Sequence, residues 1–141
     1  MRKVLYFISL ILIFISLPAQ GKTLGDDDHT IKMIVEPIFQ DFIQSFEVVS
    51  YEQFMEHLSI DVIENVDKNK FLKQSQGIKL KMGGYVSHQY LGYVNQENMT
   101  CALFKVKYSE NTDDLFFVIK LSSIGEQVII TMYQYRWRIQ N

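Results

Sequence analysis

The spacing of hydrophobic residues changes partway along this chain. From Thr30 to Phe46 they recur every three or four positions, which is the period of a helix with one wide buried face. After Gly77 apolar and polar residues alternate instead, which is the period of a strand. The pattern therefore predicts helices first and strands afterwards.

Local signals subdivide the helical part. Pro37 is expected to bend the first helix or to end a first segment near Glu36, because its ring removes a hydrogen-bond donor and clashes with the preceding turn. Ser50 and Gln53 have the spacing of a capping box, which predicts a short second helix from Tyr51 to Leu58.

A further helix of about ten residues is predicted between two terminal signals. Asp67 is a good N-cap, and Gly77 is a good residue to stop the helix. The segment before it, residues 60–66, is ambiguous.

Four strands are predicted in the second part of the chain. Their ranges are Tyr85 to Val94, Met99 to Ser109, Leu115 to Leu121 and Gln127 to Arg138. In the second strand one face is formed by Ala102, Phe104, Val106 and Tyr108. Helices followed by a meander of about four antiparallel strands indicate the α+β class, with the helices packed on one face of a curved sheet.

The first 21 residues have the pattern of a secretory signal peptide. Two cations precede an uninterrupted apolar or small-residue run at residues 4–17, and small residues follow up to Gly21. The run is shorter than the roughly 20 residues that a membrane-spanning helix needs. We expect cleavage after Gly21 or Ala19, no stable membrane anchor after cleavage, and a single periplasmic or secreted domain of residues 22–141.

Charge and cysteine content narrow the classes of partner. The chain has 14 basic and 16 acidic residues, and the leader carries two of the basic ones and none of the acidic ones, so the mature domain has a net charge of −4. This mild acidity, without a basic run, argues against nucleic acid and anionic membrane surfaces as main partners. Cys101 is the only cysteine, so no intrachain disulfide can form, and we expect it to be a buried small hydrophobe.

No cofactor or metal site is predicted. The acidic cluster from Gly25 to Thr30 precedes a helix, where carboxylates complement the helix dipole. His57 has no histidine or cysteine partner at helical spacing. Gly83 and Gly84 follow a helix and precede a strand, whereas a phosphate-binding loop has its glycines ahead of a helix. They are expected to form the joint between helix and sheet.

Several of these features occur together in one known fold. They are a hydrophobic first helix, a short second helix, a third helix that runs into a glycine-bearing joint, and then long strands. The residues concerned are Phe42, Phe46, Phe54, Leu58, Phe71, Leu72, Leu80, Gly83 or Gly84, Ser87 and His88. In this order the chain resembles small exported bacterial domains of unknown function with the cone-shaped nuclear-transport-factor-2-like fold. It departs from them at His88, where an arginine is often found, and at Phe71, where a tryptophan is often found.

The resemblance implies a sheet curved around a hollow that opens between the helices and the concave face. In enzymes of this fold, an aspartate, histidine or tyrosine in that hollow moves protons. No catalytic motif of those enzymes maps onto this chain, so the resemblance supplies an architecture and no active site.

His88 and Tyr90 are the candidate catalytic residues. On a regular strand Val86, His88 and Tyr90 share one face, and Tyr85 lies on the other. If the first face lines the hollow, the histidine and the tyrosine form a proton-transfer pair or a ligand contact. The alternative is a histidine that a neighbour satisfies on a half-buried strand face, because no carboxylate stands at a diagnostic spacing.

Tyr133, Tyr135 and Trp137 are the candidate ligand or interface residues. They share one face of the last predicted strand, opposite Ile130 and Met132. Such an aromatic stripe could stack on a ring-shaped ligand, hold a partner chain or be ordinary sheet packing. A homodimer through the open sheet face is a further alternative.

The sequence favours an exported, non-catalytic domain that binds a small apolar ligand or a protein partner. The alternative is a small pocket enzyme, an isomerase, dehydratase or hydrolase, in which His88 and a nearby tyrosine transfer a proton. A structural role in an envelope assembly is a third alternative.

Overall fold

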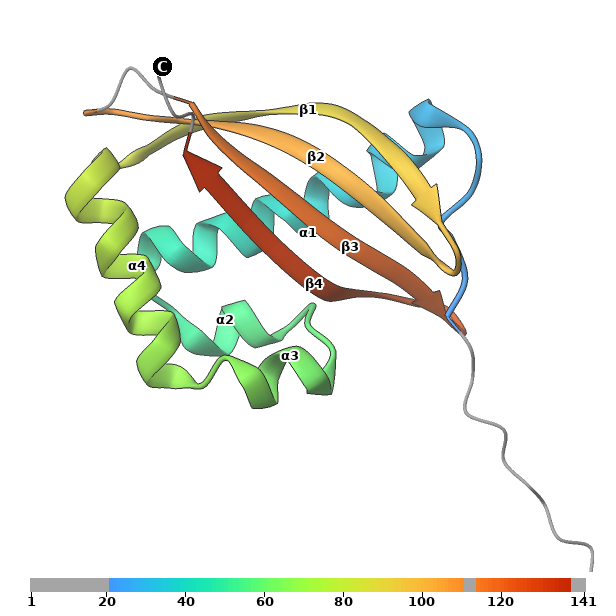
Figure 1. The fold of residues 1–141 in the computed structure, drawn as a ribbon, viewed down its shortest axis with the longest axis horizontal. Coiled ribbons are helices and arrows are strands. Elements are labelled where there is room, and N and C mark those ends of the chain that lie inside the picture. The colour runs from blue at the N-terminus through green and yellow to red at the C-terminus, as the bar shows by residue number, and fades with distance from the viewer. Residues whose placement is uncertain (1–20, 111–113, 138–141) are drawn as a thin grey trace, which may run out of the picture.

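The computed structural model describes residues 21–110 and 114–137 (Figure 1). The helices are α1 (Asp28–Val48), α2 (Tyr51–Met55), α3 (Ile60–Asn65) and α4 (Lys68–Met82). The strands are β1 (Tyr85–Gln96), β2 (Met99–Tyr108), β3 (Leu115–Ile124) and β4 (Gln127–Trp137). Helices precede strands, so the predicted α+β class is confirmed. Residues 1–20 of the expected signal peptide lie outside the described part.

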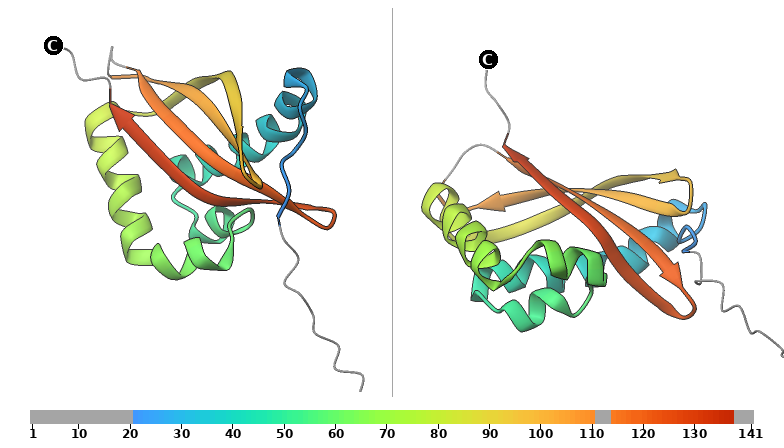
Figure 2. Two further views of the ribbon diagram at one scale, coloured as in Figure 1. Left: turned by 45° about the vertical axis from the view of Figure 1, so that its right-hand side comes forward. Right: turned by 60° about the horizontal axis from the view of Figure 1, so that its bottom comes forward.

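The strands form one antiparallel meander in the order β1-β2-β3-β4. The sheet is curved, and the described helices all lie on one side of it (Figure 2). The predicted packing of helices on one face of a curved sheet is therefore confirmed. β1 and β4 are the edge strands, and they differ in how the rest of the chain covers them.

Aromatic rings fill the space between the helices and the middle of the sheet. Phe39 of α1 stacks on Phe104 of β2, with ring centroids 3.9 Å apart and an interplanar angle of 5°. The centroids of Phe54 in α2 and Phe71 in α4 are 4.7 Å apart. The predicted inner face of β2 is buried against these rings; it consists of Ala102, Phe104, Val106 and Tyr108. Packed side chains thus fill the centre of the concave face.

Two predicted helix starts are confirmed. The side chain of Ser50 accepts a hydrogen bond from the amide of Gln53, and that of Asp67 accepts one from the amide of Lys70. The segment that the sequence leaves ambiguous becomes α3, because the Ser59 side chain caps its first turn.

The predicted ends of three helical segments are wrong. α2 ends at Met55 and not at Leu58, because the chain leaves the helix and Leu58 pairs with Ile130 of β4. α1 runs unbroken through Pro37, whose ring is on the exposed side of the helix while the residues around it pack on the sheet. α4 runs through Gly77, because burial of Ile78 and Met82 offsets the roughly 1 kcal/mol that a glycine costs inside a helix. α4 ends at Gly83, where φ is 80° and an added Cβ would lie 2.5 Å from the Ser109 hydroxyl. The predicted glycine joint between helix and sheet is confirmed.

Two β-bulges in β1 change the predicted strand faces. Val86 and Leu91 are extra residues relative to β2, and both side chains are exposed. The first bulge places Tyr85 on the same, helix-facing side as His88 and Tyr90. The expected grouping of Val86 with His88 is therefore wrong, since one inserted residue inverts the alternation.

A third bulge changes the predicted faces of β4. Thr131 is an extra residue relative to β3. As a result Ile130, which is fully buried, faces the helices together with Tyr133 and Tyr135, although simple alternation places it opposite them. Met132 stays on the outer side and is 42% exposed.

The segment before α1 is attached to the sheet. The Lys22 amide donates to the Ser123 carbonyl at 2.9 Å, and the Ser123 amide donates to the Lys22 carbonyl at 2.8 Å. The amide of Leu24 donates to the hydroxyl of Thr100 at 2.9 Å. Every member of the described hydrophobic core follows Lys22 in the chain, so we expect the chain from Lys22 onward to fold by itself.

Candidate functional site

His88 connects β1 to α1 through hydrogen bonds at both ring nitrogens. Its Nε2 lies 2.8 Å from Oε2 of Glu36, and its Nδ1 lies 2.8 Å from Oη of Tyr85. The edge of the imidazole also packs on Phe39, with ring centroids 5.1 Å apart. The His88 side chain is 9% exposed. The polar groups of this nearly buried histidine are therefore satisfied within the fold.

The two partners determine the hydrogen-bonding roles. An ionised Glu36 can only accept, so neutral His88 donates from Nε2 and accepts at Nδ1 from the Tyr85 hydroxyl. Burial raises the pKa of Tyr85; a hydrogen bond from Gln40 opposes this, and the Glu36 charge reinforces it. The phenol thus stays protonated at neutral pH. Such a chain transfers a proton usefully only if a substrate reaches the Tyr85 oxygen.

Tyr90 is paired with a different carboxylate. Its Oη donates to Oδ1 of Asp28 at 2.9 Å, and its ring packs edge-on against Phe104. Burial raises the pKa of Tyr90, and the Asp28 carboxylate raises it further. His88 and Tyr90 share a strand face as predicted, but each is bonded to its own position on α1.

A groove of about 570 Å³ opens between β4 and the helices α3 and α4. It is lined by residues 131–136 of β4 and by Asp61, Val62, Asn65, Val66 and Gln74. Two of the candidate ligand residues, Tyr133 and Tyr135, therefore line this groove. His88 and Tyr90 are on β1, at the other edge of the sheet.

Tyr133 forms a fixed part of the groove wall. Its Oη donates to Oε1 of Gln74 at 2.6 Å, and its ring packs edge-on against Phe42 and Phe54. Burial raises the pKa of Tyr133 to about 12. The next inward residue, Tyr135, packs on Phe117, and burial raises its pKa as well. Both phenols are uncharged at neutral pH.

Trp137 is the third candidate ligand residue. It is the last residue of β4 and pairs with Leu115 at the end of the sheet. Its side chain, and Arg138 after it, lie outside the described part, so its place in the site stays a prediction.

The helix-free side of the sheet is partly apolar. Leu103 pairs with Val118, and Lys105 with Phe116, across β2 and β3 on this side. Cys101 lies in the same surface and is half-buried, so the expectation of a buried thiol is wrong. The outward alternation of β2 places it there. This side is the candidate surface for a homodimer.

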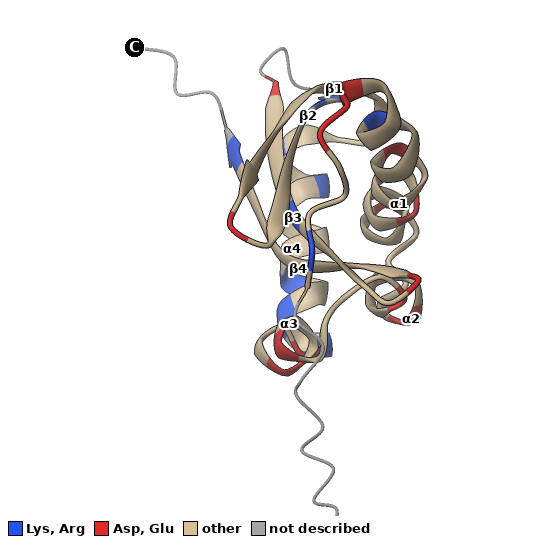
Figure 3. Ribbon diagram, turned by 90° about the vertical axis from the view of Figure 1, so that its right-hand side faces the viewer, with Lys and Arg blue, Asp and Glu red and all other residues tan. Residues whose placement is uncertain are grey.

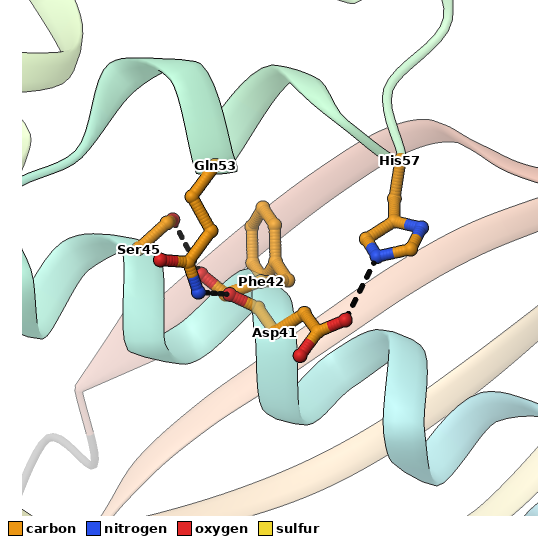
Figure 4. A network of polar contacts seen from close by, with 5 residues as sticks. All are labelled: Asp41, Phe42, Ser45, Gln53 and His57. Carbon is orange, nitrogen blue, oxygen red and sulfur yellow. Dashed lines mark hydrogen bonds and ion pairs between the residues drawn. The ribbon is translucent and has the colours of Figure 1, made fainter.

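His57 is part of a polar network that joins α1 to α2 (Figure 4). Its Nε2 lies 3.1 Å from Oδ2 of Asp41, and the Gln53 side chain donates to the Asp41 carbonyl at 3.1 Å. Gln53 thus bonds to α1 instead of completing the capping box at Ser50. Within residues 21–110 and 114–137, no group of three or more His, Cys, Asp and Glu side chains is arranged to hold a metal ion.

The sequence does not identify Glu36, Tyr85 and Gln74 as site residues. Glu36 and Gln74 bond to strand residues 52 and 59 positions away, so no local spacing marks them. Tyr85 meets His88 because of the bulge at Val86, which carries no glycine or proline signal. One sequence signal could have identified Glu36 and Gln74: each lies beside the apolar face of its helix.

Comparisons with models of known protein families, with curated proteins and with solved structures find no match for this chain. None of the described helices is long and apolar enough to cross a membrane. The functional hypotheses therefore depend on the geometry of this chain alone.

Proposed function

We propose that this chain is a non-catalytic binding domain whose site is the groove along β4. The observation that carries the proposal is that Tyr133 and Tyr135 line the same groove, of about 570 Å³, as Val62 and Val66. Ligand sites are commonly concave and mostly apolar, with a few polar groups that orient the ligand. The groove combines an apolar and aromatic part, formed by Val62, Val66, Met132, Tyr133 and Tyr135, with polar side chains around it. Its occupant is a small apolar molecule or a segment of a protein.

The support for Tyr133 adds to the proposal. Binding surfaces made of rings that packing already holds lose little conformational entropy when a ligand arrives. The Tyr133 ring is held by Phe42 and Phe54 on its inner side and by Gln74 at its hydroxyl. It is a preorganised contact for an apolar group.

We also propose that the fold is a nuclear-transport-factor-2-like cone and that the domain acts in the periplasm or outside the cell. Helices on one side of a curved four-stranded meander support the cone. The cationic and apolar pattern at residues 1–21 supports export.

Proton-transfer catalysis at His88 is the second candidate function. The observation in its favour is the chain from Glu36 through His88 to Tyr85, with both contacts at 2.8 Å. Tyr85 would exchange a proton with a bound substrate, and His88 would relay it. Binding is the better-supported function. A smaller hollow of about 390 Å³ also borders His88, but the His88 side chain is only 9% exposed and bonds to Glu36 and Tyr85 within the fold.

Native mass spectrometry of residues 22–141, purified gently from the compartment to which the chain is exported, tests the groove. We expect a stable extra mass. Asn65→Trp, at an exposed residue that lines the groove, should fill the groove and remove this mass. Glu64→Trp, at the exposed neighbour that does not line the groove, is the matched control and should retain it. An extra mass that survives Asn65→Trp would contradict the proposal.

A further inference from the structure

The groove follows the edge of β4 rather than one of its faces. Every residue from 131 to 136 lines it. Successive side chains of a strand point to opposite faces, so a groove on one face would contact every second residue. A groove bordered by consecutive residues is reached from the side of the strand, where the backbone itself is accessible.

The chain itself already pairs with this edge at one position. The Ile130 amide donates to the His57 carbonyl at 2.6 Å, and the Ser59 amide donates to the Ile130 carbonyl at 2.9 Å. These two bonds form a parallel bridge between Leu58 and Ile130. At Ile60 the chain turns into α3 and leaves the edge. The groove begins where this paired segment, residues 57–59, ends.

The ladder between β3 and β4 shows which groups face the groove. Ile130 directs both its amide and its carbonyl away from β3, so its pair with Leu121 is a non-hydrogen-bonded one. Bonded and non-bonded pairs alternate along β3, which has no extra residue at the bulge. Lys120, opposite Met132, is therefore in a bonded pair, and Ile119, opposite Tyr133, is in a non-bonded one. The amide and carbonyl of Tyr133 therefore point into the groove, and an edge of this kind accepts an added strand.

The parallel bridge at Leu58 gives the added strand a direction, and the charges along the groove then specify its two ends. Asp61 borders both this groove and a second hollow beside Gln127 and Ile129, so it lies at the end where β4 begins. Figure 3 shows acidic residues on α3. Arg136 lines the other end. A segment parallel to β4, like the Leu58 bridge, would meet Asp61 near its first residue and Arg136 near its last.

We propose that the groove binds an extended segment of a partner protein, which adds to β4 as a parallel fifth strand. The segment has a basic side chain at its start and an acidic side chain or carboxyl terminus at its end. Between them, its helix-facing side chains are apolar, because they lie against Tyr133 and Val66. This inference rests on the proposed function and specifies the occupant of the same site.

Selection from a library of random displayed hexapeptides tests the inference. The target is the chain of residues 22–141, and Asn65→Trp is the counter-target, with circular dichroism to show that this variant is folded. We expect enriched sequences that alternate apolar and polar residues and carry an acidic residue near the end. Arg136→Glu should weaken their binding at least tenfold, because it places two like charges together.

Backbone methylation of a selected peptide separates strand addition from other modes. Only every second amide of an added strand faces β4, so single N-methyl groups should weaken binding at least tenfold at alternate positions and little at those between. Strand addition is overturned if a peptide that fails to bind Asn65→Trp tolerates N-methylation at every position. The groove then remains the binding site. The same conclusion follows if Asn65→Trp removes a native mass but no peptide is enriched.

Two further outcomes are decisive. If Asn65→Trp affects neither a native mass nor any peptide, the groove proposal and strand addition both fail. The second outcome is a dimer, detected by light scattering, that Asn65→Trp dissociates and the selected peptides do not. The occupant of the edge is then a second copy of this chain, which overturns the inference.

Discussion

The two edge strands of the sheet are covered to different extents by the rest of the chain. On β1, the inward side chains of His88, Tyr90 and Tyr93 all bond to α1 or to the segment just before it. On β4, the chain pairs with the free edge at Ile130, and a groove extends beyond that point. Tyrosines are present at both edges, yet at β1 they hold elements together and at β4 they line an opening.

The lengths of the covering helices explain this difference. α1 has 21 residues, so it reaches side chains along much of β1. α3 has 6 residues and meets only part of β4 before the chain turns into α4. A helix of two turns cannot cover a strand of 11 residues, which at about 3.3 Å per residue is more than three times as long. The uncovered part of β4 is the candidate site.

The largest expected effect is at the core beneath the closed edge. Phe39→Ala removes a fully buried ring that contacts both His88 and Phe104, and should lower the free energy of unfolding by about 3–5 kcal/mol. Met33→Ala, at a 66% exposed position of the same helix, is the control and should change it by about 0.5 kcal/mol or less. Urea denaturation measures both. Similar values for the two variants would show that the β1 edge is not held by this packing.

The next effect separates a structural role of His88 from a catalytic one. Glu36→Ala leaves the His88 Nε2 without its acceptor and should cost about 1–3 kcal/mol of stability. It should leave groove binding unchanged, because Glu36 does not line the groove. Urea denaturation and native mass spectrometry test the two parts, with Glu52→Ala as the exposed control. A stable Glu36→Ala protein that loses a measured turnover would instead favour the enzyme.

Alkaline pH should lower the free energy of unfolding through Tyr133, which lies on β4. Burial raises its pKa to about 12, above the ordinary value of 10.0. The unfolded chain therefore releases this proton first, so its contribution to stability is complete below pH 10 and is lost as the pH rises towards 12. Tyr133→Phe should reduce the slope by at most about 1.4 kcal/mol per pH unit. It should also cost about 1 kcal/mol near neutral pH through the lost bond to Gln74.

Urea denaturation at several pH values between neutrality and about 11 measures this slope. Tyr85→Phe is a useful comparison, because burial also raises the pKa of Tyr85 but this residue is at the closed edge. Identical slopes for the wild-type protein and Tyr133→Phe would contradict the expected role of Tyr133.

The smallest expected effect on stability concerns the open side of the sheet. Val118→Lys places a charge in the middle of this surface, next to Leu103, and should change the free energy of unfolding by about 1 kcal/mol or less. If the chain forms a homodimer there, the variant should be monomeric in size-exclusion chromatography with light scattering. A dimer that Val118→Lys leaves intact would direct attention to the β4 edge instead.

Local patterns in the sequence predict the class of the fold and much of its core. The helical spacing in α1 and the alternation in β2 identify buried residues such as Phe39, Phe42 and Phe104. Caps at Ser50 and Asp67 are also predictable, because each satisfies an amide only three residues away.

The arrangement of the site is not predictable in the same way. Bulges at Val86 and Thr131 invert the alternation that defines a strand face, and neither residue type marks a bulge. Gly77 resembles a helix stop, but the burial of Ile78 beyond it decides the outcome. The groove depends on where α3 ends relative to β4, which is a tertiary relation and has no sequence period.

The bridge between Lys22 and Ser123 has a consequence for the order of events if the chain is exported and cleaved as proposed. If the leader is cleaved after Gly21, the new amino terminus is the nitrogen that donates to the Ser123 carbonyl at 2.9 Å. In the folded chain this backbone is paired, and a Cβ added to Gly21 would lie 2.8 Å from the side chain of Ser122. A peptidase needs the same segment extended in its own active site. If this cleavage occurs, processing would precede the docking of this segment, and the released ammonium would then form the contact with Ser123.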